Sequence, residues 1–101
     1  MMDSLHSIVA KEITDHLRID LSNKYPAIDV WARHLYARSI ITISHREEPL
    51  YYRTIIIGDE GITHMNSGLC SFADPITISK TIEFVTSELE TCMHRFYHGQ
   101  S

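Results

Sequence analysis

Two runs of β-branched residues stand at the centre of the hydrophobic pattern. The runs IITI (40–43) and TIII (54–57) flank a polar turn that contains Pro49, and the segment GDEG (58–61) follows the second run. β-Branched side chains suit the pleated surface of a sheet, and polar segments rich in glycine or proline bound such strands. The pattern therefore predicts an antiparallel meander with strands at about residues 38–45, 50–57 and 61–65.

The preceding segment, residues 27–38, fits two patterns. As a strand it alternates apolar and polar positions along its first half. As a helix it would begin after Pro26, and it would place on one face Ile28, Trp31 and Leu35. We favour a strand over about residues 28–34, joined to the meander by a tight connection at 35–37, because a fourth strand leaves less of the sheet edge unpaired.

The N-terminal segment has the three- and four-residue spacing of an amphipathic helix. The helix is expected over about residues 3–22, with Asp3 or Ser4 as its cap, and the NKYP segment (23–26) ends it before the proline. Its apolar positions are Leu5, Ile8, Val9, Ile13, Leu17 and Leu21.

The C-terminal segment has the same spacing. This helix is expected to open at Asp74-Pro75, a cap followed by a first-turn proline, and to end at Gly99. Thr77 and Ser79 are alternative caps if residues 76–78 are extended. The apolar stripe consists of Ile82, Val85, Leu89, Cys92 and Phe96. Residues 66–73 are predicted to form a loop that returns the chain across the sheet.

The predicted order is α-β-β-β-β-α, an α+β fold in which both terminal helices pack on one face of an antiparallel meander sheet. The chain has 101 residues, of which 44% are hydrophobic, so residues 1–101 form a single domain with one modest core. The Cys70 and Cys92 pair is too small a set for a disulfide framework, and we expect two thiols.

The net charge and the lack of long apolar runs argue against two classes of partner, nucleic acids and membranes. The formal charge of −4 argues against a protein that coats nucleic acid by neutralising phosphates. No apolar run approaches the roughly 18 residues of a membrane span, and the N-terminal MMDSLH lacks the pattern of a signal peptide. We therefore expect a cytoplasmic protein without a membrane partner.

Aromatic and arginine side chains gather in the predicted sheet, where residues 26–57 carry four Lys/Arg against three Asp/Glu. Strand side chains alternate, so some of them must lie on the face that the helices leave open. The whole set is Trp31, Arg33, Tyr36, Arg38, Tyr51, Tyr52 and Arg53. All but Tyr52 form the candidate binding face: Trp31, Arg33, Tyr36, Arg38, Tyr51 and Arg53.

Candidate chemistry elsewhere is sparse. Glu90, His94 and His98 have helical spacing, but a zinc site needs further ligands, so we expect no metal and no cofactor. Cys70 lies near His64 and Asp74 in the sequence, and spacing alone supplies neither a base nor an oxyanion site. We therefore expect a buried thiol at Cys70 in a loop and no enzyme activity.

Two functions from different classes fit this pattern. The first is a non-catalytic protein-interaction or regulatory domain, a homodimer that uses the open sheet face or the long C-terminal helix. Small acidic domains of this kind occur as inhibitors or regulators made by phages and mobile elements, an analogy at the level of fold. The alternative is a single-stranded nucleic-acid-binding module that stacks bases on the open sheet face.

Overall fold

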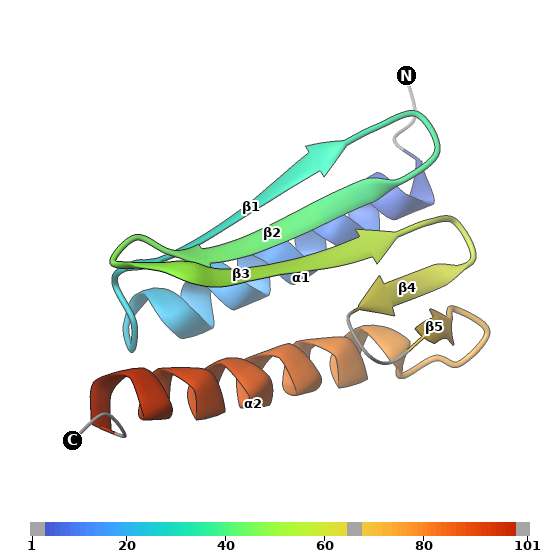
Figure 1. Cartoon of the computed structure of the whole chain (residues 1–101). Coiled ribbons are helices and arrows are strands. Elements are labelled where there is room, and N and C mark those ends of the chain that lie inside the picture. The colour runs from blue at the N-terminus through green and yellow to red at the C-terminus, as the bar shows by residue number, and fades with distance from the viewer. Residues whose placement is uncertain (1–3, 65–67, 99–101) are drawn as a thin grey trace.

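A five-stranded antiparallel sheet with both helices on one face forms the fold (Figure 1). The computed structural model describes residues 4–64 and 68–98, and within these ranges the side chains of 22, 48–51, 64, 68 and 92–98 are left undescribed. The elements are α1 (Leu5–Ser22), β1 (Ile28–His34), β2 (Ser39–His45), β3 (Glu48–Ile57), β4 (Gly61–His64), β5 (Gly68–Ser71) and α2 (Thr77–His98). The predicted α+β meander with two terminal helices is confirmed.

The strand interpretation of the segment after Pro26 is also confirmed. β1 pairs with β2 from Ile28↔His45 to His34↔Ser39. A tight turn connects the two strands, closed by a hydrogen bond from the Leu35 N–H to the Arg38 carbonyl at 2.8 Å. In this segment the alternation of apolar and polar positions, which is typical of a strand, therefore predicted the structure correctly. The helical spacing of Ile28, Trp31 and Leu35 did not.

A fifth strand stands where the sequence predicted a loop. β5 pairs with β4 from Gly61↔Ser71 to His64↔Gly68, so Cys70 lies on a strand. Gly61 makes this pairing possible, because a Cβ at that position would overlap the Cys70 carbonyl oxygen. Four residues are too few for a readable alternation, which is why the sequence pattern missed the strand.

The β2–β3 turn is shorter than the predicted charged loop. β3 begins at Glu48, and the register shifts between Ser44 and His45. Pro49 thus lies within β3, in the part of the strand that extends beyond the pairing with β4. A proline is tolerated there because no strand on that side requires its missing N–H.

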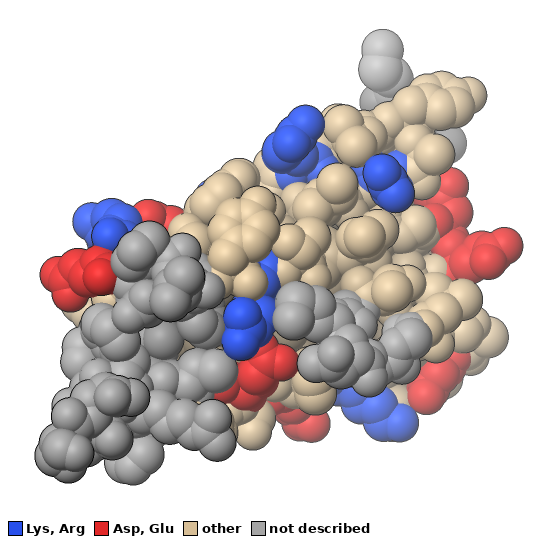
Figure 2. All heavy atoms as spheres, in the orientation of Figure 1, with Lys and Arg blue, Asp and Glu red and all other residues tan. Residues whose placement is uncertain are grey.

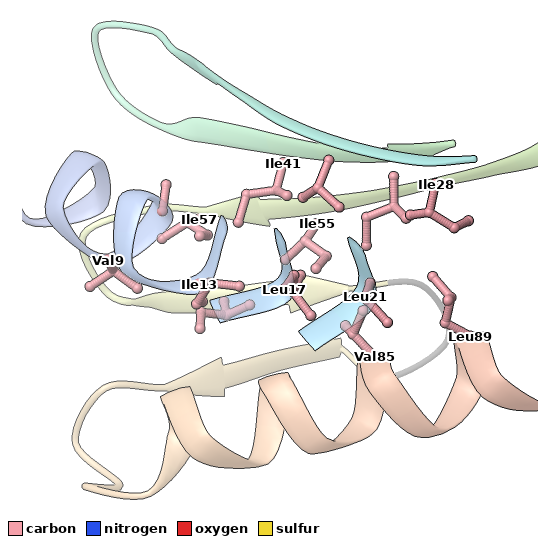
Figure 3. Close-up of a cluster of buried hydrophobic side chains, with 14 residues drawn as sticks. Val9, Ile13, Leu17, Leu21, Ile28, Ile41, Ile55, Ile57, Val85 and Leu89 are labelled. Carbon is pink, nitrogen blue, oxygen red and sulfur yellow. The ribbon is translucent and has the colours of Figure 1, made fainter. Parts of the chain in front are cut away.

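The core lies between the sheet and the helices, as the side chains in Figure 3 show. α1 packs across β1, β2 and β3, whereas α2 packs beside α1 and β4. The sheet contributes mainly isoleucines, and the helices contribute leucine, valine and isoleucine. The buried set is Val9, Ala10, Ile13, Leu17, Leu21, Ile28, Val30, Ile41, Ile43, Ile55, Ile57, Ile62, Val85 and Leu89.

The first turn of α1 differs from the predicted stripe. Leu5 and Ile8 are exposed, whereas His6 and Ala10 are buried. The inward positions follow the series 6, 10, 13 and 17, which keeps one helical face toward the sheet. Ala10 is small enough to let the helix backbone approach the strands closely.

Ser4, one of the two predicted caps, has the expected position at the start of α1, whereas α2 begins after the predicted Asp74-Pro75 start. Ser4 stands at the N-cap of α1 but makes no capping hydrogen bond with its side chain. Asp74 accepts the Ile76 N–H at 3.1 Å, so it closes the turn that precedes α2. Thr77 is the first residue of α2 and uses its hydroxyl elsewhere. The expected roles of Asp3, Met65 and Gly99 lie outside the described residues.

Within the described residues, neither helix has a stretch long and apolar enough to cross a membrane.

Candidate interaction surface

Strand register assigns every described sheet residue to one of two faces. Val30 pairs with Ile43 and Ile41 with Ile55, and these residues face the helices. Their neighbours along each strand must face the opposite way. The face without helices, here called the open face, is turned toward the viewer in Figure 2, because α1 lies behind the sheet in the same orientation.

A band of mainly uncharged side chains crosses the open face, with the charged residues Arg33 and Asp29 at its β1 end. One cross-strand row runs through five strands and contains Arg33, Ile40, Ile56, Thr63 and Leu69. A second row contains Trp31, Thr42 and Thr54, and a third contains Asp29, Ser44 and Tyr52. Figure 2 shows this band as a tan area with charged side chains mainly around its margin.

Three large side chains of the open face are substantially accessible. Trp31 is 37% exposed, Tyr52 57% and Leu69 58%. Ile40 and Ile56 between them are half-buried. Accessible apolar side chains therefore lie on three of the five strands of the open face, with threonines between them.

The six residues of the predicted binding face do not all lie on the same surface in the structure. Trp31 and Arg33 lie on the open face, while Tyr36 and Arg38 lie in the β1–β2 turn at its end. The side chain of Tyr51 is outside the described part. Tyr52, left out of the predicted face, belongs to the open face.

The prediction that Arg53 belongs to the binding face is wrong, because Arg53 faces the helices. It pairs in register with Ile43, and its Nε donates to the Glu88 carboxylate of α2 at 2.9 Å. The sequence contained the signal, since positions 53, 55 and 57 of one strand share a face and the last two are isoleucines that had to be buried.

A hollow of about 310 Å³ lies on the open face where the β1–β2 and β3–β4 turns meet. Arg38 enters it from the first turn, and Asp59 and Glu60 enter it from the second. Ile56 and Leu69 supply an apolar part of the lining. The hollow thus combines an apolar surface with charges of both signs.

Side chains from the two helices cap the outer edges of the sheet. The Arg18 Nε of α1 donates to the Val30 carbonyl of β1 at 2.8 Å. At the other edge, the Thr77 hydroxyl of α2 donates to the Ser71 carbonyl of β5 at 2.5 Å. Both carbonyls belong to residues whose backbone groups point away from the neighbouring strand, so these contacts hinder the addition of another strand.

A serine between two histidines is the arrangement closest to a catalytic set. Ser39 Oγ lies 2.8 Å from His6 Nδ1 and 2.9 Å from His34 Nδ1. A serine nucleophile needs a neighbouring base, and this one has it. However, Ser39 is completely buried, so no substrate reaches its hydroxyl.

The other candidate chemistry does not assemble in the described part of the chain. No group of three or more His, Cys, Asp or Glu side chains lies close enough there to hold a metal ion. Glu90 binds Lys24 at 2.8 Å, and this hydrogen bond raises the pKa of Lys24. The side chains of His64, His94 and His98 are outside the description.

Comparisons with protein-family models, with curated proteins and with solved structures give no match for this chain.

Proposed function

We propose that this chain is a non-catalytic interaction module that forms a homodimer through the open face of its sheet. The observation that carries the proposal is the accessible apolar surface around Trp31, Tyr52 and Leu69, on a face that neither helix covers. Large apolar side chains left accessible on one uncovered face support an interaction site there. Aromatic side chains are also enriched at interface cores.

The size of the open face suits a second sheet. With strands about 4.8 Å apart and about 3.3 Å per residue, the five strands cover roughly 500 Å² in projection. The about 800 Å² that each partner buries in a standard interface counts side-chain surface, which a projected area leaves out. Two sheets packed face to face, about 10 Å apart, are a common arrangement in proteins.

Charge at the margin of the open face favours a second copy as the occupant. An interface between identical copies brings one surface against itself, so the surface needs charges of both signs. Arg33 and Arg38 supply positive charge near one end of the open face, and Asp59 and Glu60 supply negative charge at the same end. None of these four side chains has an ion pair within the described residues.

Light scattering at micromolar concentration tests this proposal. We expect a dimer for the unaltered chain and a monomer for Tyr52→Glu, which places a charge in the apolar surface. Ile19→Glu is the matched control, because Ile19 is exposed on α1 rather than on the sheet, and it should leave the dimer intact. A strictly monomeric parent chain would contradict the proposal.

The second candidate function is binding of single-stranded nucleic acid. Trp31 and Tyr52 share the open face with Arg33, and aromatic platforms beside arginines stack bases. The carboxylates of Asp59 and Glu60 beside the same face would repel phosphates, so this function comes second. Titration of Trp31 fluorescence with an oligonucleotide at low salt separates the two: quenching that disappears with salt supports nucleic acid, and unchanged fluorescence excludes it.

A further inference from the structure

Tyr36 is a fully exposed aromatic side chain in the turn between β1 and β2. It occupies, with Ala37, the two central positions of the turn closed by Leu35 and Arg38. Two-residue hairpin turns normally carry Asn-Gly, Asp-Gly or Gly-Gly at these positions. The aromatic group of Tyr36 contributes nothing to the core of this chain and is fully available to a partner.

The hollow on the open face begins directly beside this turn. Ala37 and Arg38 line it, although Tyr36, their neighbour in the sequence, does not. Full exposure of the Tyr36 ring means that it does not fill the hollow of its own chain. The molecule therefore presents a projecting aromatic group and a partly apolar hollow side by side.

We propose that Tyr36 of each copy docks into the hollow of the other copy, so that two equivalent contacts hold the dimer. This inference rests on the proposed homodimer and specifies how the two copies recognise each other. The lining of the hollow matches each part of a tyrosine side chain. The ring packs on Ile56 and Leu69, and the Arg38 guanidinium offers a cation to the ring face.

The phenol hydroxyl also has partners in the hollow. The carboxylates of Asp59 and Glu60 come from the turn on the other side of the hollow and accept hydrogen bonds. A hydrogen bond from a hydroxyl to a carboxylate is charge-assisted and stronger than a neutral one. In this arrangement the acidic β3–β4 turn accepts the hydrogen bond of the Tyr36 hydroxyl, a function that a purely apolar docking site would not have.

Symmetry allows both contacts to form together. In a two-fold dimer, residue i of one copy contacts residue j of the other, and the reverse contact follows. Ala37 both follows Tyr36 and lines the hollow, so an axis passing near Ala37 carries each Tyr36 to the hollow of the partner copy. Such an exchange needs no change in the fold of either copy.

Sedimentation equilibrium of variants tests the exchange. We expect Tyr36→Ala to raise the dimer Kd by about thirtyfold or more, as removal of an interface hot spot does. Tyr36→Phe keeps the ring and loses the hydroxyl, so its Kd should lie between those of the parent chain and Tyr36→Ala. Ile19→Ala, also at an exposed position, is the control and should leave the Kd unchanged.

A mixing experiment identifies the contact itself. Thr63→Trp fills the hollow, because the exposed Thr63 lines it, while Tyr36 stays intact. Alone, Thr63→Trp and Tyr36→Ala should each dimerise weakly, and an equimolar mixture should form heterodimers more tightly than either, since one Tyr36-hollow contact is restored. Circular dichroism confirms that each variant is folded.

The outcomes separate the two levels of the proposal. If the parent chain dimerises and Tyr36→Ala dimerises equally well, the exchange is wrong and the face-to-face dimer stands. If the single variants weaken the dimer and their mixture restores nothing, the exchange is also wrong. If the parent chain is monomeric, the homodimer and the exchange fail together, and the hollow is left to a different partner.

Discussion

His6 Nδ1 lies 2.8 Å from the hydroxyl oxygen of Ser39, and this contact joins the first turn of α1 to the start of β2. Both side chains are buried. His6 Nε2 lies 2.9 Å from the Ser4 hydroxyl oxygen and 3.3 Å from the Tyr36 carbonyl oxygen. The same Ser39 hydroxyl lies 2.9 Å from His34 Nδ1, so Ser39 joins the two imidazoles. This network fixes the base of the turn that presents Tyr36.

Ser39→Ala should lower the free energy of unfolding by about 1–3 kcal/mol, because it leaves a buried imidazole nitrogen of His6 without its hydrogen-bond partner. Urea denaturation measures this loss. Ser79→Ala, at an exposed position of α2, is the matched control and should change stability little or raise it slightly, since alanine favours helices. Equal effects of the two substitutions would contradict the role of the network.

Gly61→Ala should destabilise the β4–β5 pair. The added Cβ would overlap the Cys70 carbonyl oxygen, and overpacking of this kind costs about 1–3 kcal/mol or more. Gly58→Ala is the control from the same turn, because its Cβ would meet nothing within 4 Å. Thermal unfolding of both variants checks the contrast, and similar Tm values for the two would show that β5 does not pair as described.

Arg53 and Glu88 should be energetically coupled across the sheet-helix boundary. Their charged atoms lie 2.9 Å apart, and the side chains are only 30% and 28% exposed, so water screens them less than it screens a surface pair. A double-mutant cycle with Arg53→Ala and Glu88→Ala should give a coupling of about 0.5–1 kcal/mol that falls with added salt. Strict additivity would mean that the pair contributes nothing to holding α2 on the sheet.

Arg18→Ala should make the chain more prone to aggregate. The substitution uncovers the Val30 carbonyl on edge strand β1, and uncapped edges pair with other strands. Turbidity during mild heating measures the effect. Lys11→Ala removes an exposed cation from the same helix, where Lys11 binds only Asp15 among the described ion pairs, and it should aggregate at the parent rate. Faster aggregation of both variants would point to lost charge instead.

Local patterns predicted most of the fold because each long element has a readable period. The isoleucine runs fixed β2 and β3, and alternation from Ile28 fixed β1. β5 was not predicted because a strand of four residues is too short to show a clear alternation. Its formation also depends on the close approach of the Gly61 and Cys70 backbones. Such an approach is a property of two distant segments.

The candidate surface was only partly predictable for a similar reason. Arg53 is two and four residues before the buried Ile55 and Ile57 in the same strand, so it lies on the same face as they do. Its position on the helix side could therefore have been predicted from the sequence. The hollow beside Arg38 could not have been predicted. It forms between two turns that are about twenty residues apart in the chain. The His6–Ser39 contact likewise joins residues 33 positions apart.

Quenching of the single tryptophan tests the central claim most directly. Trp31 lies on the open face and is 37% exposed in the single chain, so a second copy on that face would cover it. We predict that the acrylamide quenching constant of Trp31 falls severalfold as the protein concentration rises through the micromolar range, and that Tyr52→Glu abolishes this fall. A quenching constant that stays the same from nanomolar to high micromolar protein would contradict the account.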